Sequence, residues 1–277
     1  MMTYDAFRTG ELQGWDARAD DYDTATARAT IQSIPDLLAA ARLAPGLRLL
    51  DVCCGPGYAT GAAAALGVEA QGIDFAPGMV RAAQTRFPAA TFDVGDAENL
   101  PFDDASFNAV VCNFGLNHVT DPGRAMREAI RVLVPGGFYT FSVWLPPDRN
   151  PAFNLIFGTL TAHADMTLAP KAPDAFALTA PKAAETMLRE AGFDTLGVRD
   201  VQNILKVPAD GLFNFFYRFS VRFALIHDPQ TETVQRAIRA EFDRTARAFL
   251  IGHDVCIPMP SHVFYGQKPE FGKERTT

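Results

Sequence analysis

Three aspartates and one glycine-rich turn are the residues in this sequence best suited to hold a nucleoside ligand. Asp51 ends an apolar run and is followed by the turn Gly55-Pro56-Gly57. Glycines let the backbone approach a ligand closely, and a helix that starts after the turn adds unpaired amide donors. Asp74 ends the next apolar run, where a carboxylate can accept two hydrogen bonds from a ribose diol. Asp96 follows the third run.

Asp51 and Thr60 indicate what kind of ligand the turn accepts. A dinucleotide fingerprint needs a third glycine where this chain has Thr60. A carboxylate at Asp51 would repel a pyrophosphate but attract an ammonium group. The pattern therefore disfavours a nicotinamide-dependent dehydrogenase. The structural alternatives are that Asp51 caps a helix, that Asp74 is a solvated acid at a strand end, and that Asp96 forms a turn.

His118 is the candidate general base. It follows the fourth apolar run by a few residues, and an unperturbed imidazole titrates near pH ~6.5. The alternative is a surface or structural histidine. The other histidines are weaker candidates, and they are His163, His227, His253 and His262.

Strands that alternate with helices must position these groups. We expect strands at 47–53, 69–74, 91–94, 107–113, 138–144, 195–207 (bent near Asn203) and 261–267. We expect helices at 59–66, 77–87, 122–132 and 180–191, the third stopped by Pro135-Gly136-Gly137 and the last capped by Thr179. Near-continuous apolar strands, each followed by a helix, indicate a parallel sheet covered on both faces. Ligands bind such sheets at the carboxyl ends of the strands.

The remaining segments are predicted to be mostly helical. Residues 1–46 either pack on the core or form a lid, with Trp15 and Tyr22 as its aromatic surface. Residues 209–252 open with an aromatic run, either core or part of a substrate wall, comprising Phe213, Phe215, Phe216, Tyr217, Phe219 and Phe223.

Composition narrows the class of protein. The 277 residues carry a net charge of -7 and a pI of about 5.2, which disfavours a nucleic-acid partner. No stretch has the length and apolar character of a signal peptide or a transmembrane helix. The cysteines Cys53, Cys54, Cys112 and Cys256 lack metal-ligand spacing, so we expect no metal site and a cytoplasmic protein with reduced thiols. Cys53 and Cys54 are interpreted as small buried residues.

Five motifs together resemble the class I S-adenosylmethionine-dependent methyltransferases, specifically the ubiquinone/menaquinone-biosynthesis-like group of small-molecule enzymes. They are LLDVCCGPG at 49–57, GID at 72–74, GDAENLPF at 95–102, SFNAVV at 106–111 and RVLVPGG at 131–137. The resemblance covers residues 47–145 strongly and the two ends of the chain weakly.

The resemblance implies an α/β fold, a Rossmann-like doubly wound sheet of seven mostly parallel strands with the last antiparallel, plus helical cap insertions. It implies a core of residues 47–145, 179–207 and 261–267, and an N-terminal helical lid at 1–46. The cap insertions, 146–178 and 208–260, would form the substrate pocket.

The family pattern also implies a role for each site residue. Asp51 would orient the methionine ammonium of S-adenosylmethionine, and Asp74 would hold the ribose hydroxyls. The backbone at Cys53, Gly55 and Gly57 would line methionine and ribose. The family usually has glycine where this chain has Cys53.

The other implied contacts are to the adenine and the sulfonium. Phe75 and Met79 would flank the adenine. Asp96 would accept a hydrogen bond from the adenine amino group, and Ala97 would donate through its backbone. The floor near the sulfonium would be formed by Asn113 and Phe114.

We therefore expect an enzyme that transfers a methyl group by SN2 displacement to a small, apolar or aromatic metabolite. The alternative is a protein that keeps the fold and S-adenosylmethionine but does not methylate, such as a cyclase or a complex partner. The expected partner is a small molecule, with no nucleic acid and no transmembrane segment, and a homodimer is left open.

Overall fold

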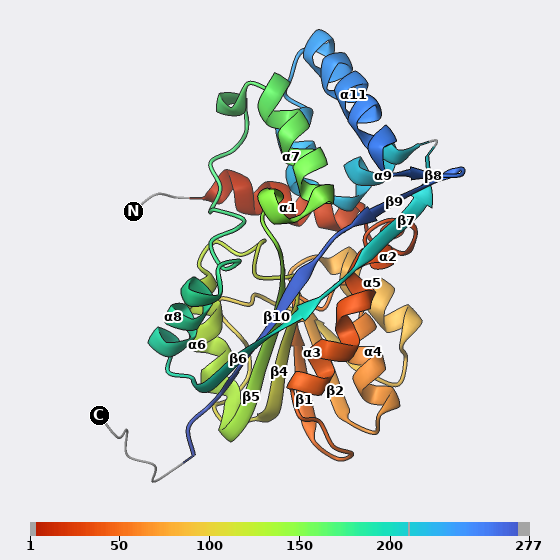
Figure 1. The fold of residues 1–277 in the computed structure, drawn as a ribbon. Coiled ribbons are helices and arrows are strands. Elements are labelled where there is room, and N and C mark those ends of the chain that lie inside the picture. Colours follow the sequence, from red (N-terminus) through yellow and green to blue (C-terminus); the bar gives the residue numbers. More distant parts are fainter. Residues whose placement is uncertain (1–3, 210, 271–277) are drawn as a thin grey trace.

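A seven-stranded sheet is the centre of the computed structural model, which describes residues 4–209 and 211–270 (Figure 1). The order is β3-β2-β1-β4-β5-β10-β6. The first five strands pair in parallel, and β10 runs antiparallel to both β5 and β6, which confirms the expected fold. The strands span Arg48–Val52 (β1), Glu69–Asp74 (β2), Thr91–Val94 (β3), Phe107–Asn113 (β4), Leu133–Trp144 (β5), Asp194–Val201 (β6) and Ser261–Gln267 (β10).

Helices cover both faces of the sheet because successive strand residues point to opposite sides. Leu49 packs in the cluster that includes α3 (Ile34–Ala40) and α4 (Tyr58–Ala65). Its neighbour Leu50 packs in the cluster that includes α6 (Pro122–Val132) and α8 (Pro181–Ala191). A further helix, α5 (Pro77–Arg86), packs against β2 and β3. Strands buried on both faces explain the near-continuous apolar runs.

Two local predictions were wrong. Pro135-Gly136-Gly137 does not separate α6 from a strand, because β5 already begins at Leu133. Gly136 has φ +80°, and the pairing register of β5 with β4 shifts between Phe107 and Ala109, so the glycines form an irregularity within the strand. Thr179 does not cap α8; its hydroxyl donates to the carbonyl of Phe176 at 2.8 Å.

The predicted sixth strand is two strands in different sheets. β6 ends at Val201, and β7 (Ile204–Pro208) pairs with β9 (Asp254–Pro258), which pairs with β8 (Leu250–Ile251). The buried Asn203 fixes the break, because its side-chain amide donates to Ser33 Oγ at 3.0 Å and its backbone carbonyl accepts from the Met259 amide at 2.8 Å. β8 and β9 lie in a segment expected to be helical.

The small sheet and four helices share a second hydrophobic core, which we call the cap. Its helices are α7 (Pro151–His163), α9 (Leu212–Phe219), α10 (Val221–His227) and α11 (Glu232–Ala246). Figure 1 shows the cap above the large sheet, with α1 (Asp5–Ala17) and α2 (Ala27–Thr30) between them. Short 3₁₀ turns lie at Tyr22–Thr24, Ile31–Ser33, Pro147–Arg149, Met166–Leu168 and Arg247–Phe249. None of the helices in the described ranges has the length and apolar character needed to cross a membrane.

Candidate functional site

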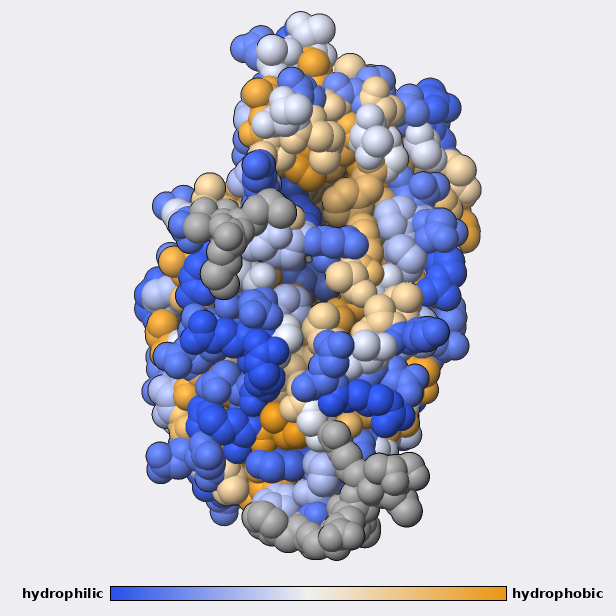
Figure 2. Space-filling model, turned by 90° about the vertical axis from the view of Figure 1, so that its left-hand side faces the viewer, coloured by the Kyte–Doolittle hydropathy of each residue, from blue (hydrophilic) through white to orange (hydrophobic). Residues whose placement is uncertain are grey.

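A single pocket gathers all the predicted site residues except Asp51 and Gly57. It lies at the carboxyl ends of β1, β2 and β4, next to the point where the strand order reverses between β1 and β4. Figure 2 shows a hollow in the surface, with hydrophobic residues gathered above it. The predicted residues that line it are Cys53, Gly55, Asp74, Phe75, Met79, Asp96, Ala97, Asn113, Phe114 and His118.

Asp51 lies behind the glycine turn, in a small adjoining cavity that Cys53 and Asn113 also line. Its side chain is buried, with 1% of its surface exposed. Oδ2 accepts hydrogen bonds from the Thr60 amide (3.0 Å) and the Thr60 hydroxyl (2.7 Å), while Oδ1 has no partner among the described residues. Burial raises the pKa of Asp51 to about 7. Because buried charges need a partner, a cationic hydrogen-bond donor would satisfy the unpartnered Oδ1.

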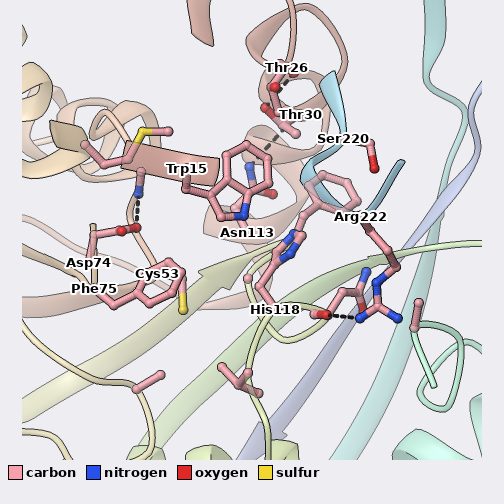
Figure 3. Close-up of a pocket in the computed structure, with 18 of the residues that line it drawn as sticks. Trp15, Thr26, Thr30, Cys53, Asp74, Phe75, Asn113, His118, Ser220 and Arg222 are labelled. Carbon is pink, nitrogen blue, oxygen red and sulfur yellow. Dashed lines mark hydrogen bonds between the residues drawn. The ribbon is translucent and has the colours of Figure 1, made fainter. Parts of the chain in front are cut away.

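Asp74 is held by the backbone on both sides. Oδ2 accepts from the Gly55 amide at 2.8 Å, and Oδ1 accepts from the Ala76 amide at 2.9 Å, so the carboxylate faces the pocket in one orientation (Figure 3). Burial raises the pKa of Asp74 to about 6. Gly57 has φ +83°, and a Cβ built at this position would lie 2.8 Å from the Phe92 ring. Gly57 therefore contributes to the shape of the turn on the side away from the pocket, where a side chain would not fit.

Cys53 adopts φ +57°, a left-handed conformation that favours glycine. A Cβ built on Gly115 would lie 2.4 Å from Cys53 Cβ and 2.7 Å from Cys112 Sγ. The thiol side chain thus occupies the space above Gly115. A hydrogen bond with Cys112, together with burial, raises the pKa of the Cys53 thiol well above its usual range. Cys53 is half-buried and lines the pocket, so the interpretation of a small buried residue is confirmed for Cys54 only.

Asp96 and Met79 lie near α1. Asp96 accepts from the Glu98 amide at 2.9 Å and forms an ion pair with Arg8 of α1 at 2.8 Å. Met79 is buried in a cluster with Trp15 of α1, against which Phe75 also packs. Ala97 is buried at the pocket wall.

Asn113 and Phe114 are fixed by Ser142 of β5. The Asn113 amide donates to the Thr30 carbonyl at 3.1 Å, and its Oδ1 accepts from the Ser142 hydroxyl at 2.7 Å. The Phe114 amide donates to the same Ser142 Oγ at 2.9 Å. Phe114 has φ +60° and stacks on Trp144, with ring centroids 3.8 Å apart. These hydrogen bonds hold both residues in the pocket lining.

His118 contacts two residues of α1, namely Trp15, which the sequence analysis named as lid surface, and Glu11, which it did not name. Its Nδ1 lies 2.8 Å from Oε2 of Glu11, and its ring packs edge-on against Trp15, with centroids 5.0 Å apart. Figure 3 shows Trp15 and His118 side by side, with Asp74 toward one end of the pocket and Arg222 toward the other. Glu11 carries no signal in the sequence, because one acid in a helix of mixed polarity usually faces solvent.

An apolar half of the pocket extends from His118 into the cap. Of the aromatic run at 213–223, only Phe219 lines it; Phe213, Phe215, Phe216 and Phe223 pack in the cap core. The other aromatic walls come from β5, α7 and the segment after α7, and they are Trp144, Phe153, Phe157 and Phe176. Phe153, Phe157 and Phe176 fall in a segment without a strand pattern, so the sequence did not single them out, whereas Trp144 ends the strand expected at 138–144.

The remaining histidines lie outside the pocket lining. Across 4–209 and 211–270, no cluster of His, Cys, Asp or Glu has the geometry of a metal site.

Comparison with known proteins gives both sequence and structure matches. Residues 50–141 match the family model described as a methyltransferase domain. The demethylmenaquinone methyltransferase of Renibacterium salmoninarum is 39% identical over 107 residues, which are 39% of this chain and 45% of that protein. The match therefore spans less than half the length of this relative.

Two solved structures share the fold at low sequence identity. The YcgJ protein of Bacillus subtilis is 20% identical, with a TM-score of 0.58 over 86% of this chain and 98% of the other. The [4+2]-cyclase SpnF is 23% identical, with a TM-score of 0.54 over 87% of this chain and 81% of the other.

Proposed function

We propose that the chain transfers a methyl group from S-adenosylmethionine to a small apolar or aromatic acceptor, and the match of residues 50–141 to the family model of a methyltransferase domain supports this. The observation that carries the proposal is the buried, unpartnered Oδ1 of Asp51 beside the glycine turn. An ammonium group supplies the cationic donor that this oxygen lacks.

The remaining strand-end residues fit the rest of S-adenosylmethionine. The Asp74 carboxylate is oriented to accept from a ribose diol. Phe75 and Met79 offer apolar surface for an adenine, and Asp96 and Ala97 offer an acceptor and a backbone donor at its edge. Bound there, the cofactor supplies a methyl group activated by a positive sulfur, and the chain's task is to hold the acceptor in line with it.

The aromatic half of the pocket supports a ring-shaped acceptor. Trp144, Phe153, Phe157 and Phe219 provide faces and edges for stacking. The name of the Renibacterium relative suggests a quinol as the acceptor. We take a hydroquinone or a phenol as the class to test first.

We propose that residues 1–46 act as a lid and that the insertions 146–178 and 208–260 form the acceptor pocket. α1 supports this division, because it lies between the cap and the sheet and contributes Trp15 to the pocket wall. Within the same segment, α3 packs on the sheet, so the lid in this proposal is chiefly α1.

We further propose a small-molecule enzyme of the cytoplasm. The net charge of -7 supports a small molecule over a nucleic acid as partner. Cys53, Cys54, Cys112 and Cys256 are all unbridged, as is usual in a reducing compartment.

The test is transfer of an isotope-labelled methyl group. Purified protein is incubated with methyl-labelled S-adenosylmethionine and a panel of hydroquinones and phenols, and the products are analysed by mass spectrometry. We expect a labelled product and S-adenosylhomocysteine in equal amounts. Tight cofactor binding without label in any acceptor would instead favour the non-methylating alternative.

A further inference from the structure

Glu11 is a buried acid that the function proposed above does not use. Its side chain is fully buried on α1, with 0% of its surface exposed. Oε2 accepts a hydrogen bond from Trp15 Nε1 at 2.9 Å and lies 2.8 Å from His118 Nδ1. Oε1 has no partner among the described residues. A buried carboxylate is costly unless charges or donors compensate for it, so this position needs an explanation.

The Glu11 contact selects the tautomer of a neutral His118 ring. A carboxylate only accepts hydrogen bonds, so the proton of a neutral imidazole must sit on Nδ1 to make this contact. Nε2 is then left with a free lone pair. Trp15 holds the ring edge-on, and His118 lines the pocket with 27% of its side chain exposed.

Arg222 of α10 supports the same arrangement from the other side. It donates to the carbonyls of Asn117 (3.1 Å) and Pro173 (2.8 Å), which anchors the residue just before His118. Burial lowers the pKa of Arg222, and the charge of Glu11 acts against that shift. The guanidinium therefore offsets part of the cost of burying the Glu11 carboxylate.

We propose that Glu11 is a positioning residue that makes His118 Nε2 the general base of the methyl transfer. This rests on the function proposed above. The hydroxyl of the acceptor gives its proton to Nε2, and the electron pair released forms the new bond to the methyl carbon. The methyl–sulfur bond breaks, and its electron pair stays on sulfur. His118 later loses the proton to solvent.

The proposal ties the base to the position of α1. Glu11 and Trp15 both belong to this helix, while His118 follows β4. The base is therefore oriented only when α1 packs on the pocket. If Glu11 had only a structural role, a neutral side chain that accepts the hydrogen bond from Trp15 Nε1 would serve equally well.

The test compares Glu11→Gln and His118→Asn with the wild type. Glu11→Gln keeps shape and size but removes the charge. We expect kcat to fall at least ~10-fold in Glu11→Gln and at least ~100-fold in His118→Asn, with KM for the acceptor and affinity for S-adenosylmethionine within about twofold of wild type. Asp5→Asn is the matched control, because it removes a charge from an exposed position of the same helix, and its kcat should match that of the wild type.

Nitrogen-15 NMR of the imidazoles measures the His118 tautomer directly. It tests the role of Glu11 independently of whether the protein methylates an acceptor. The chain has five histidines, so His118→Asn assigns the signal. We expect an Nδ1–H tautomer for His118 in wild type and a mixture in Glu11→Gln, whether or not an acceptor is methylated. An unchanged tautomer, or parallel losses of kcat, cofactor affinity and thermal stability in Glu11→Gln, would overturn the proposal.

Discussion

Cys53 and Gly115 share one space at the turn after β1. The left-handed backbone of Cys53 costs a non-glycine residue roughly 1–2 kcal/mol. Its side chain nevertheless fills the volume that a side chain at residue 115 would need. The family that this chain resembles usually has glycine at the position of Cys53. Here Gly115, in the loop after β4, leaves room for the Cys53 side chain.

A double-mutant cycle tests this pairing. Gly115→Ala should lower the free energy of unfolding by about 1–3 kcal/mol, because the new Cβ overlaps Cys53. Cys53→Gly alone should change it by less, since relief of backbone strain offsets lost packing. In the double variant, urea unfolding should show that Cys53→Gly recovers at least ~1 kcal/mol of the Gly115→Ala loss. Additive effects would show that the two residues do not share the space.

The pKa values of Asp51 and Asp74 make the site pH-dependent. Burial raises them to about 7 and about 6, against about 3.9 in an unfolded chain. For an acid with a raised pKa, its contribution to stability is greatest below pH ~4 and is lost as the pH rises through the folded value. A bound cation reverses this preference because it favours the charged carboxylate.

Affinity for S-adenosylmethionine should therefore rise with pH while the ammonium of the ligand stays protonated. Between pH ~5.5 and ~7.5 we expect at least a ~10-fold decrease in Kd, because binding draws on ionised Asp51. Asp51→Asn should bind more weakly and with a flatter pH profile. Calorimetric titrations at a series of pH values measure both, and an equally steep profile in Asp51→Asn would contradict the role of Asp51.

Among single residues, the sequence identified those that follow strand ends. Asp51, Asp74 and His118 each stand next to an apolar run, so their position relative to the sheet could be inferred. Glu11 and Phe153 could not be assigned in this way. Their place in the pocket depends on how α1 and the cap pack, which is a long-range property.

At the level of elements, α1 depends on two glycines to lie close to α10. A Cβ on Gly14 would lie 2.4 Å from Val221 Cγ1, and a Cβ on Gly10 would lie 2.8 Å from Leu225 Cδ2. Each glycine costs helix stability of about 1 kcal/mol relative to alanine. The close approach positions Glu11 and Trp15 over the pocket.

Gly14→Ala and Gly158→Ala form a matched pair that tests this packing. Both glycines lie inside helices, but a Cβ on Gly158 of α7 would meet only Asn154 Oδ1, at 3.6 Å. Gly158→Ala should raise the free energy of unfolding by about 0.5–1 kcal/mol. Gly14→Ala should lower it and speed hydrogen exchange over α1, as read by mass spectrometry. Equal stabilisation by both would mean that α1 does not need the close contact.

The elements that were predicted well are those whose ends have local causes. α5 and α6 begin at prolines, which suit a first helical turn, and β2, β3 and β4 end where apolar runs end. The break at Asn203 was seen only as a bend, because a buried side-chain amide and pairing with β9 decide it. These partners are distant in sequence.

At the scale of the whole molecule, the pocket forms where two cores meet. The sheet core supplies acids and backbone amides, the cap core supplies aromatic rings, and α1 lies between them. The parallel sheet followed from the alternating pattern of the sequence. The cap's small sheet did not, because its strands are short and β7 pairs with β9 across the helices α9, α10 and α11.

The most direct test of the account is a calorimetric titration with S-adenosylmethionine, S-adenosylhomocysteine and NAD. We expect wild type to bind both adenosyl ligands and not NAD. Asp74→Ala should weaken binding of the adenosyl ligands by about 1.5–3 kcal/mol, through lost hydrogen bonds from the ribose to a charged group. Absence of heat with both adenosyl ligands, or unchanged affinity in Asp74→Ala, would contradict the assignment of the strand-end pocket as the cofactor site.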